Sequence, residues 1–131
     1  MALRAVAEYA DRWNVGPLSA AELEAKLEVL QRHCERFDRD PGDIRVTHMN
    51  DVVLRTDHEA AHTAYEERTA LTASGPTPRS EDRGLIGTPA ELLEKVAQYE
   101  EAGTETLIAK VPVNDRRTIE LLVDEVIPEA V

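Results

Sequence analysis

The sequence predicts an α/β fold in which parallel strands alternate with helices. Segments rich in β-branched residues alternate with segments whose apolar residues recur at helical spacing, and two capping boxes mark where helices begin. Parallel strands need long crossover connections, which are usually helices and are right-handed. We expect all 131 residues to form a single domain, because this length suits one hydrophobic core.

The N-terminal part contains two expected strands between helices. We expect a helix over residues 2–11 and a strand over 12–15. Ser19 and Glu22 have the spacing of a capping box, which begins a long amphipathic helix, and residues 44–54 form a β-rich run. The apolar stripe of that helix consists of Leu23, Leu27, Leu30, Cys34 and Phe37.

The middle of the chain begins a third helix at an Asp57 cap and then enters a segment with turn residues. Prolines, glycines and mixed charge over residues 73–84 predict a flexible loop. Thr88 and Glu91 form the second capping box, and Gly103 is placed to end the helix that follows.

The C-terminal part predicts a strand over 106–111 and a last helix over 114–127, with Pro128 as its stop. The inward-facing residues of this helix are expected to be Ile119, Leu122, Val123 and Val126.

Composition excludes some classes of function. Fifteen basic and 26 acidic residues give a formal charge of −11, which repels nucleic acids and anionic membrane surfaces. No apolar run approaches the ~20 residues that span a bilayer. The single cysteine, Cys34, cannot form an internal disulfide, and we expect a cytoplasmic location.

Four segments, in the same order, resemble one known family. Residues 10–14, Ala-Asp-Arg-Trp-Asn, look like the Ala-Asp-Gly-Trp-Asn segment of the luciferase-like monooxygenases, which include bacterial luciferase and deazaflavin-dependent oxidoreductases. Residues 27–41 are similar to the family's long helix and Arg-Asp-Pro turn, and residues 87–91 resemble its Gly-Thr/Ser-Pro-Glu-Glu helix start. Residues 102–108 look like its final helix end and strand.

The resemblance implies a (β/α)₈ barrel that binds FMN or the deazaflavin coenzyme F-420. Such barrels typically have ~250 residues, so we expect this chain to form a partial TIM-barrel unit, about the last three strands. The family's Gly-rich loop would precede the segment matched by residues 2–14, and Arg12 replaces the family's usual glycine. We therefore expect the isolated chain to bind either cofactor weakly, with a Kd above about 10 μM.

Three residues are candidates for the site. Trp13 and Asn14 lie where a barrel strand would end, so they form either a wall of the flavin or substrate pocket, or a packed core aromatic and a turn residue. His48 is either a proton donor beside a reduced flavin or a hydrogen-bonded core histidine, and the catalytic residue is otherwise unknown.

Other reactive residue types have simpler interpretations. His58 and His62 share a helical spacing that suits a metal, but no third ligand accompanies them, so we expect a solvated helix face and no metal site. Cys34 is expected to be a small buried hydrophobe. Lys110 could face an anionic substrate.

The sequence supports two functions of different classes. One is a flavin- or deazaflavin-dependent oxidoreductase, monooxygenase-like, that acts as an oligomer; the other is a non-catalytic homodimeric scaffold or binding module. A part-barrel leaves its inner apolar face bare, so we expect a homodimer in which two copies cover these faces. A separate chain could instead supply the missing barrel half. The inner face consists of Val46, Val52 and Leu54, or alternatively of Met49 and Val53.

Overall fold

A computed structural model describes residues 2–70 and 84–130. These residues fall into two compact units, which are described separately below. Unit 1 comprises residues 1–49 and 98–108, and unit 2 comprises residues 50–97 and 109–131. The expected single domain stays a prediction. All of the expected loop over 73–84 except Gly84 lies outside the described residues.

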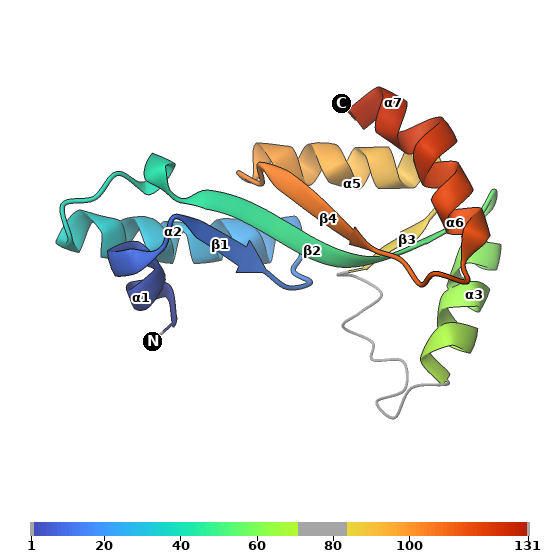
Figure 1. The fold of residues 1–131 in the computed structure, drawn as a ribbon, viewed down its shortest axis with the longest axis horizontal. Coiled ribbons are helices and arrows are strands. Elements are labelled where there is room, and N and C mark those ends of the chain that lie inside the picture. Colours follow the sequence, from blue (N-terminus) through green and yellow to red (C-terminus); the bar gives the residue numbers. More distant parts are fainter. Residues whose placement is uncertain (1, 71–83, 131) are drawn as a thin grey trace. The chain divides into compact units, whose positions relative to one another are not determined.

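Helices and strands alternate along the chain (Figure 1). The elements are α1 (Ala2–Tyr9), β1 (Arg12–Val15), α2 (Ala20–Arg36), η1 (Pro41–Asp43), β2 (Arg45–Leu54), α3 (His58–Ala70), β3 (Leu85–Gly87), α5 (Pro89–Glu101), β4 (Thr106–Lys110), α6 (Arg116–Leu121), η2 (Leu122–Val126) and α7 (Ile127–Ala130). Each expected strand is present within a residue of its predicted bounds.

One four-stranded sheet is centred on β2. β1 lies parallel to the beginning of β2, with Trp13 opposite Val46 and Val15 opposite His48. β3 lies parallel to the end of β2, and β4 also pairs with β2. The sheet is not closed, so the predicted α/β fold with a partial barrel unit is confirmed.

The core of unit 1 is apolar. Ala7 from α1, Leu30 and Cys34 from α2, and Ile44 before β2 form a buried cluster, against which Trp13 also packs. The predicted capping box begins α2: the Glu22 N–H donates to Ser19 Oγ at 3.2 Å, and the Ser19 N–H donates to Glu22 Oε2 at 2.9 Å. Gly103 follows α5 with a φ of +106°, as a helix-ending glycine does.

The core of unit 2 is built around the end of β2. Val53 and Ile86 pack against Ala61 and Tyr65 of α3. The second predicted capping box, Thr88 with Glu91, begins α5. Gly87 has a φ of +152°, and a Cβ there would collide with the Glu91 carboxylate, so this position requires glycine.

The last helix is oriented differently from its prediction. Ile119 and Val123 are exposed, and Leu122 is only half-buried. Val126 is buried as predicted, but Thr118 and Leu121 are the other buried residues, because the Thr118 hydroxyl bonds to the backbone of β2. Pro128 does not end the helix but lies within α7, which continues η2 without a break.

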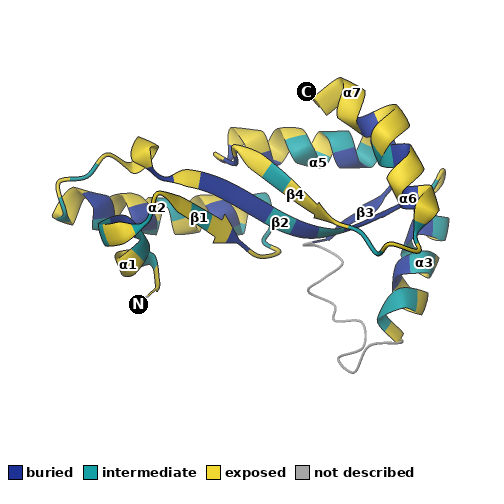
Figure 2. Ribbon diagram, in the orientation of Figure 1, coloured by how far each residue is buried: buried dark blue, intermediate teal, exposed yellow. Residues whose placement is uncertain are grey.

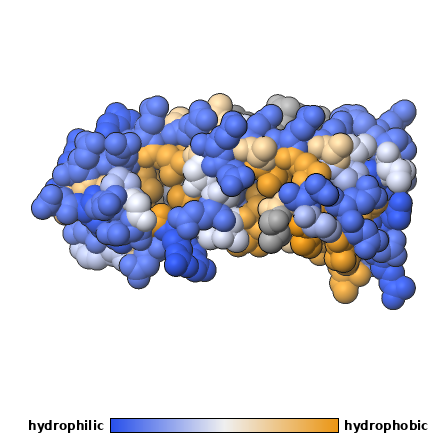
Figure 3. Space-filling model, turned by 90° about the horizontal axis from the view of Figure 1, so that it is seen from above, coloured by the Kyte–Doolittle hydropathy of each residue, from blue (hydrophilic) through white to orange (hydrophobic). Residues whose placement is uncertain are grey.

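The expected bare inner face is also wrong. Val46, Val52, Val53 and Leu54 are 5% exposed or less within the single chain, and Met49 is half-buried. Most of β2 is accordingly coloured as buried in Figure 2. Apolar surface nevertheless reaches solvent in patches between hydrophilic side chains (Figure 3). The large apolar residues that are exposed in the described part of the chain are Tyr9, Ile108, Val113, Ile119, Val123 and Ile127.

Candidate functional site

The carboxyl end of β1 carries the first group of polar side chains, in unit 1. Asn14 lies opposite Thr47 in the parallel register, and the Thr47 hydroxyl donates to Asn14 Oδ1 at 3.0 Å. Thr47 is 5% exposed, whereas Asn14 is exposed. The pair therefore presents an amide on the sheet face that carries odd-numbered β2 residues.

Trp13 points away from this pair, because successive side chains of a strand alternate between faces. It is half-buried against the Leu30 and Cys34 cluster. The structure thus separates the two residues that the sequence placed together, and brings Thr47 to Asn14 instead. Their role in binding a cofactor stays a prediction.

His48 lies on the opposite face from Thr47 and is fully buried. Its Nε2 accepts a hydrogen bond from the Leu18 N–H at 3.2 Å, and its ring meets the Tyr99 ring edge-on at 4.4 Å between centroids. The Tyr99 hydroxyl donates to the Leu18 carbonyl at 2.8 Å, so both rings hold the connection between β1 and α2.

Burial lowers the pKa of His48, and a backbone hydrogen bond with Gly16 opposes this only in part. A neutral imidazole also fits the observed contact, because Nε2 must carry a lone pair to accept from Leu18. This geometry matches a hydrogen-bonded core histidine; a catalytic role for His48 stays a prediction.

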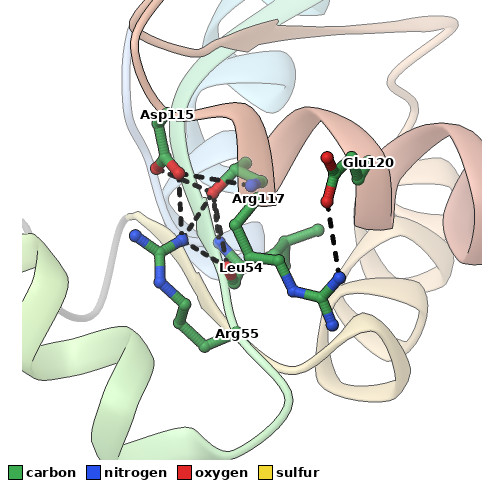
Figure 4. Close-up of polar contacts among 6 residues, drawn as sticks. Leu54, Arg55, Asp115, Arg117 and Glu120 are labelled. Carbon is green, nitrogen blue, oxygen red and sulfur yellow. Dashed lines mark hydrogen bonds and ion pairs between the residues drawn. The ribbon is translucent and has the colours of Figure 1, made fainter.

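Unit 2 carries a polar cluster at the end of β2 (Figure 4). Thr118 is fully buried; its Oγ1 accepts from the Leu54 N–H at 2.9 Å and donates to Asp115 Oδ2 at 2.8 Å. Arg55 Nη1 lies 3.0 Å from Asp115 Oδ1 and donates to the Leu54 carbonyl at 2.6 Å. These bonds satisfy both backbone groups of Leu54 and tie α6 to the strand. Sequence reasoning missed this cluster, because Arg55 is 60 residues from Asp115 along the chain.

Two cations converge on Asp51 in unit 2. Arg68 Nη2 and Lys110 Nζ lie 2.8 Å and 3.3 Å from Asp51 Oδ1. Lys110, which could have faced an anionic substrate, is thus paired with a carboxylate while its side chain stays 59% exposed.

An open groove of about 510 Å³ runs beside α3 in unit 2. Arg55, Asp57, Glu59 and Glu67 contribute the charged part of its lining. Three carboxylates against one guanidinium disfavour a phosphate-bearing ligand. The groove is therefore a poor place for FMN or F-420.

The histidine pair of α3 lies on a partly solvated face. His58 Nδ1 is 2.9 Å from Glu91 Oε1, and the rings of His58 and His62 are 4.3 Å apart. Within residues 2–70 and 84–130, no group of three His, Cys, Asp or Glu side chains could hold a metal ion. Cys34 is buried as predicted, and this burial raises the pKa of its thiol.

No helix in the described part of the chain is long and apolar enough to cross a membrane. No family model matches the chain, and a search of curated proteins gives no match.

Solved structures show the fold of the chain clearly. The F-420-dependent tetrahydromethanopterin reductase of Methanopyrus kandleri aligns with a TM-score of 0.77 and 16% identity, over 98% of this chain and 48% of the reductase. An F-420-dependent secondary alcohol dehydrogenase, in complex with an F-420–acetone adduct, gives 0.75 and 12%, over 98% and 46%.

A riboflavin lyase with modified FMN and riboflavin gives a TM-score of 0.73 and 13% identity, over 97% of this chain and 40% of the lyase. The chain spans less than half the length of each of these proteins. Over that part, it has the fold that its resemblance to the luciferase-like monooxygenases implies.

Proposed function

We propose that the chain is part of a flavin- or deazaflavin-dependent oxidoreductase of the luciferase-like type. The observation that carries this proposal is the alignment of nearly the whole chain with two F-420-dependent enzymes and a structure that contains modified FMN. When bound, the cofactor supplies hydride transfer or oxygen activation, while the protein binds and orients it and excludes water.

The sheet face that carries Asn14 and Thr47 suits the ring system of a flavin or deazaflavin. The Thr47 hydroxyl occupies Asn14 Oδ1, so the amide nitrogen of Asn14 can donate to a carbonyl oxygen of a flavin or deazaflavin. Thr47 is buried and fixes the orientation of that amide. Asn14 is therefore the residue we assign to cofactor binding, with Thr47 as its positioning residue.

Titration of purified chain with FMN and with F-420, followed by cofactor fluorescence, tests the assignment. We expect a Kd above about 10 μM for the isolated chain, because an open sheet supplies only part of a pocket. Asn14→Ala should weaken binding about five- to ten-fold, the usual value of one hydrogen bond.

Asn114→Ala is the matched control, since it makes the same change at an exposed position in unit 2 and should leave binding unchanged. Equal binding by Asn14→Ala and wild type would remove Asn14 from the site.

A non-catalytic scaffold or binding module is the second candidate function. The observation that favours it is that the ring of His48, the candidate proton donor, is buried and bonded to Leu18. Failure of both cofactors to change fluorescence in the titration would support this candidate over the oxidoreductase.

We also propose that the chain functions as a homodimer. Six large apolar side chains are exposed among the described residues, and twofold dimers are the commonest soluble oligomers. The alternative, a separate chain that completes the barrel, predicts instead that the purified chain alone is a monomer.

A further inference from the structure

The C-terminal helical segment, Arg116–Ala130 in unit 2, has two apolar faces. One face is buried and contains Thr118, Leu121 and Val126. The other contains Ile119, Val123 and Ile127, which are 40%, 54% and 50% exposed. We call these three residues the outer stripe. Single exposed apolar residues are ordinary on a protein surface, but three that follow one another along a helix indicate a contact face.

The π turn η2 keeps the outer stripe in line. In an α-helix, a four-residue step rotates by about 400°, so residues at i, i+4 and i+8 drift by about 40° per step. A π turn contains more residues per turn and takes up this drift between Leu122 and Val126. As a result, Ile127 returns towards the direction of Ile119, and the outer stripe runs along the segment rather than around it.

Charge is distributed unevenly along the same segment. Arg116 and Arg117 are at its beginning, where Glu120 pairs with Arg117 at 3.5 Å, whereas Asp124, Glu125 and Glu129 are in its second half. Two such segments that run antiparallel would place the basic beginning of each beside the acidic second half of the other. Parallel segments would instead place like charges together, which is destabilising.

We propose that the outer stripe is the surface on which a second copy of this chain docks, antiparallel and related by a twofold axis near Val123. Val123 then meets Val123 of the second copy, and Ile119 meets the second copy's Ile127. This proposal rests on the homodimer proposed above and assigns its surface. It replaces the inner face of the sheet, whose apolar residues the chain already buries.

Sedimentation velocity of the whole chain tests the surface, over loading concentrations of roughly 1 to 100 μM. We expect wild type to be a dimer at the upper end of this range. Val123→Arg should weaken dimerisation by about 100-fold or more, because two like charges meet at the axis. Val123 is 54% exposed, so the variant should keep the wild-type circular dichroism spectrum.

Tyr9→Arg is the control, because Tyr9 is 76% exposed in unit 1 and should leave dimerisation unchanged. A monomeric wild type overturns both the homodimer and its surface. A dimeric wild type with an equally dimeric, folded Val123→Arg overturns the surface alone.

Charge reversal tests the antiparallel arrangement. The double variant Arg116→Glu and Arg117→Glu should weaken dimerisation about three- to ten-fold, as expected for the loss of exposed ion pairs. The double variant Glu125→Arg and Glu129→Arg should weaken it by about the same factor. All four changes together restore opposite charges and should return the dissociation constant to within about three-fold of wild type. A combination as weak as its two parts would overturn the antiparallel arrangement.

Discussion

The two units fix the same strand by different means. In unit 1, the beginning of β2 is held by apolar packing around Leu30 and by a neutral buried imidazole, His48. In unit 2, the end of β2 is held by a cluster of charged and hydroxyl side chains, in which Thr118 Oγ1 accepts from the Leu54 N–H and Arg55 donates to the Leu54 carbonyl. Apolar packing tolerates a change of shape poorly, whereas a buried polar cluster tolerates the loss of one hydrogen-bonding atom poorly.

The two units also differ in the surroundings of one shared sequence motif, the capping box. Glu22 and Glu91 both close their boxes, and Glu91 in unit 2 also pairs with His58 at 2.9 Å. The Thr88 backbone N–H is the main cause that lowers the pKa of Glu91, and His58 adds to it. A local motif is thus predictable from sequence, but its electrostatic setting is not.

The largest expected effect on the free energy of unfolding comes from a substitution in the apolar cluster of unit 1. Leu30 is 2% exposed in the unit 1 cluster, so Leu30→Ala leaves a cavity and should lower the free energy of unfolding by about 3 kcal/mol. Urea unfolding followed by circular dichroism measures it. Leu27→Ala, one turn earlier and only half-buried, is the control and should cost about half as much. Equal losses would show that burial does not set the cost in this unit.

The matching change in the polar cluster of unit 2 is Thr118→Val, which keeps the shape of the side chain but removes its hydroxyl. The Leu54 N–H and the Asp115 carboxylate then each lose a buried partner, so the free energy of unfolding should fall by about 2 kcal/mol. Thr118→Ser keeps the hydroxyl and should lose less in the same urea experiment. If Thr118→Ser is the less stable variant, packing rather than hydrogen bonding holds this end of β2.

Sequence patterns predicted the elements that depend on local chemistry. Both capping boxes, the stop at Gly103 and the strand over 12–15 were predicted, because propensity and capping act within a few residues. The orientation of the last helix was not. The spacing of four apolar residues predicted that Ile119 and Val123 face inward. In the structure Thr118 faces β2 instead, because its hydroxyl bonds to the backbone of that strand.

The candidate site shows the same limit. Alternation within β1 separates Trp13 from Asn14, and this could have been predicted. The pairing of Asn14 with Thr47 depends on the register between β1 and β2, and no local signal in either strand fixes that register. Polar pairs between distant segments therefore stayed beyond sequence reasoning, as did the Arg55, Asp115 and Thr118 cluster.

The smallest expected effect concerns the buried imidazole of unit 1 and depends on pH. Burial lowers the pKa of His48 below its ordinary value of 6.5, so between these two values the unfolded chain binds a proton that the folded chain does not. His48 therefore makes its full contribution to the free energy of unfolding above pH 6.5. This contribution falls as the pH drops below 6.5, by at most about 1.4 kcal/mol per pH unit.

His48→Gln removes this titration while its side-chain oxygen can still accept from the Leu18 N–H. Urea unfolding at several pH values between roughly 5 and 8 should show a shallower loss of stability in acid for His48→Gln than for wild type. Wild type is the reference for this slope, because it differs from His48→Gln at this side chain alone. A wild-type slope in His48→Gln would mean that burial does not change the proton affinity of this imidazole, which would contradict the prediction.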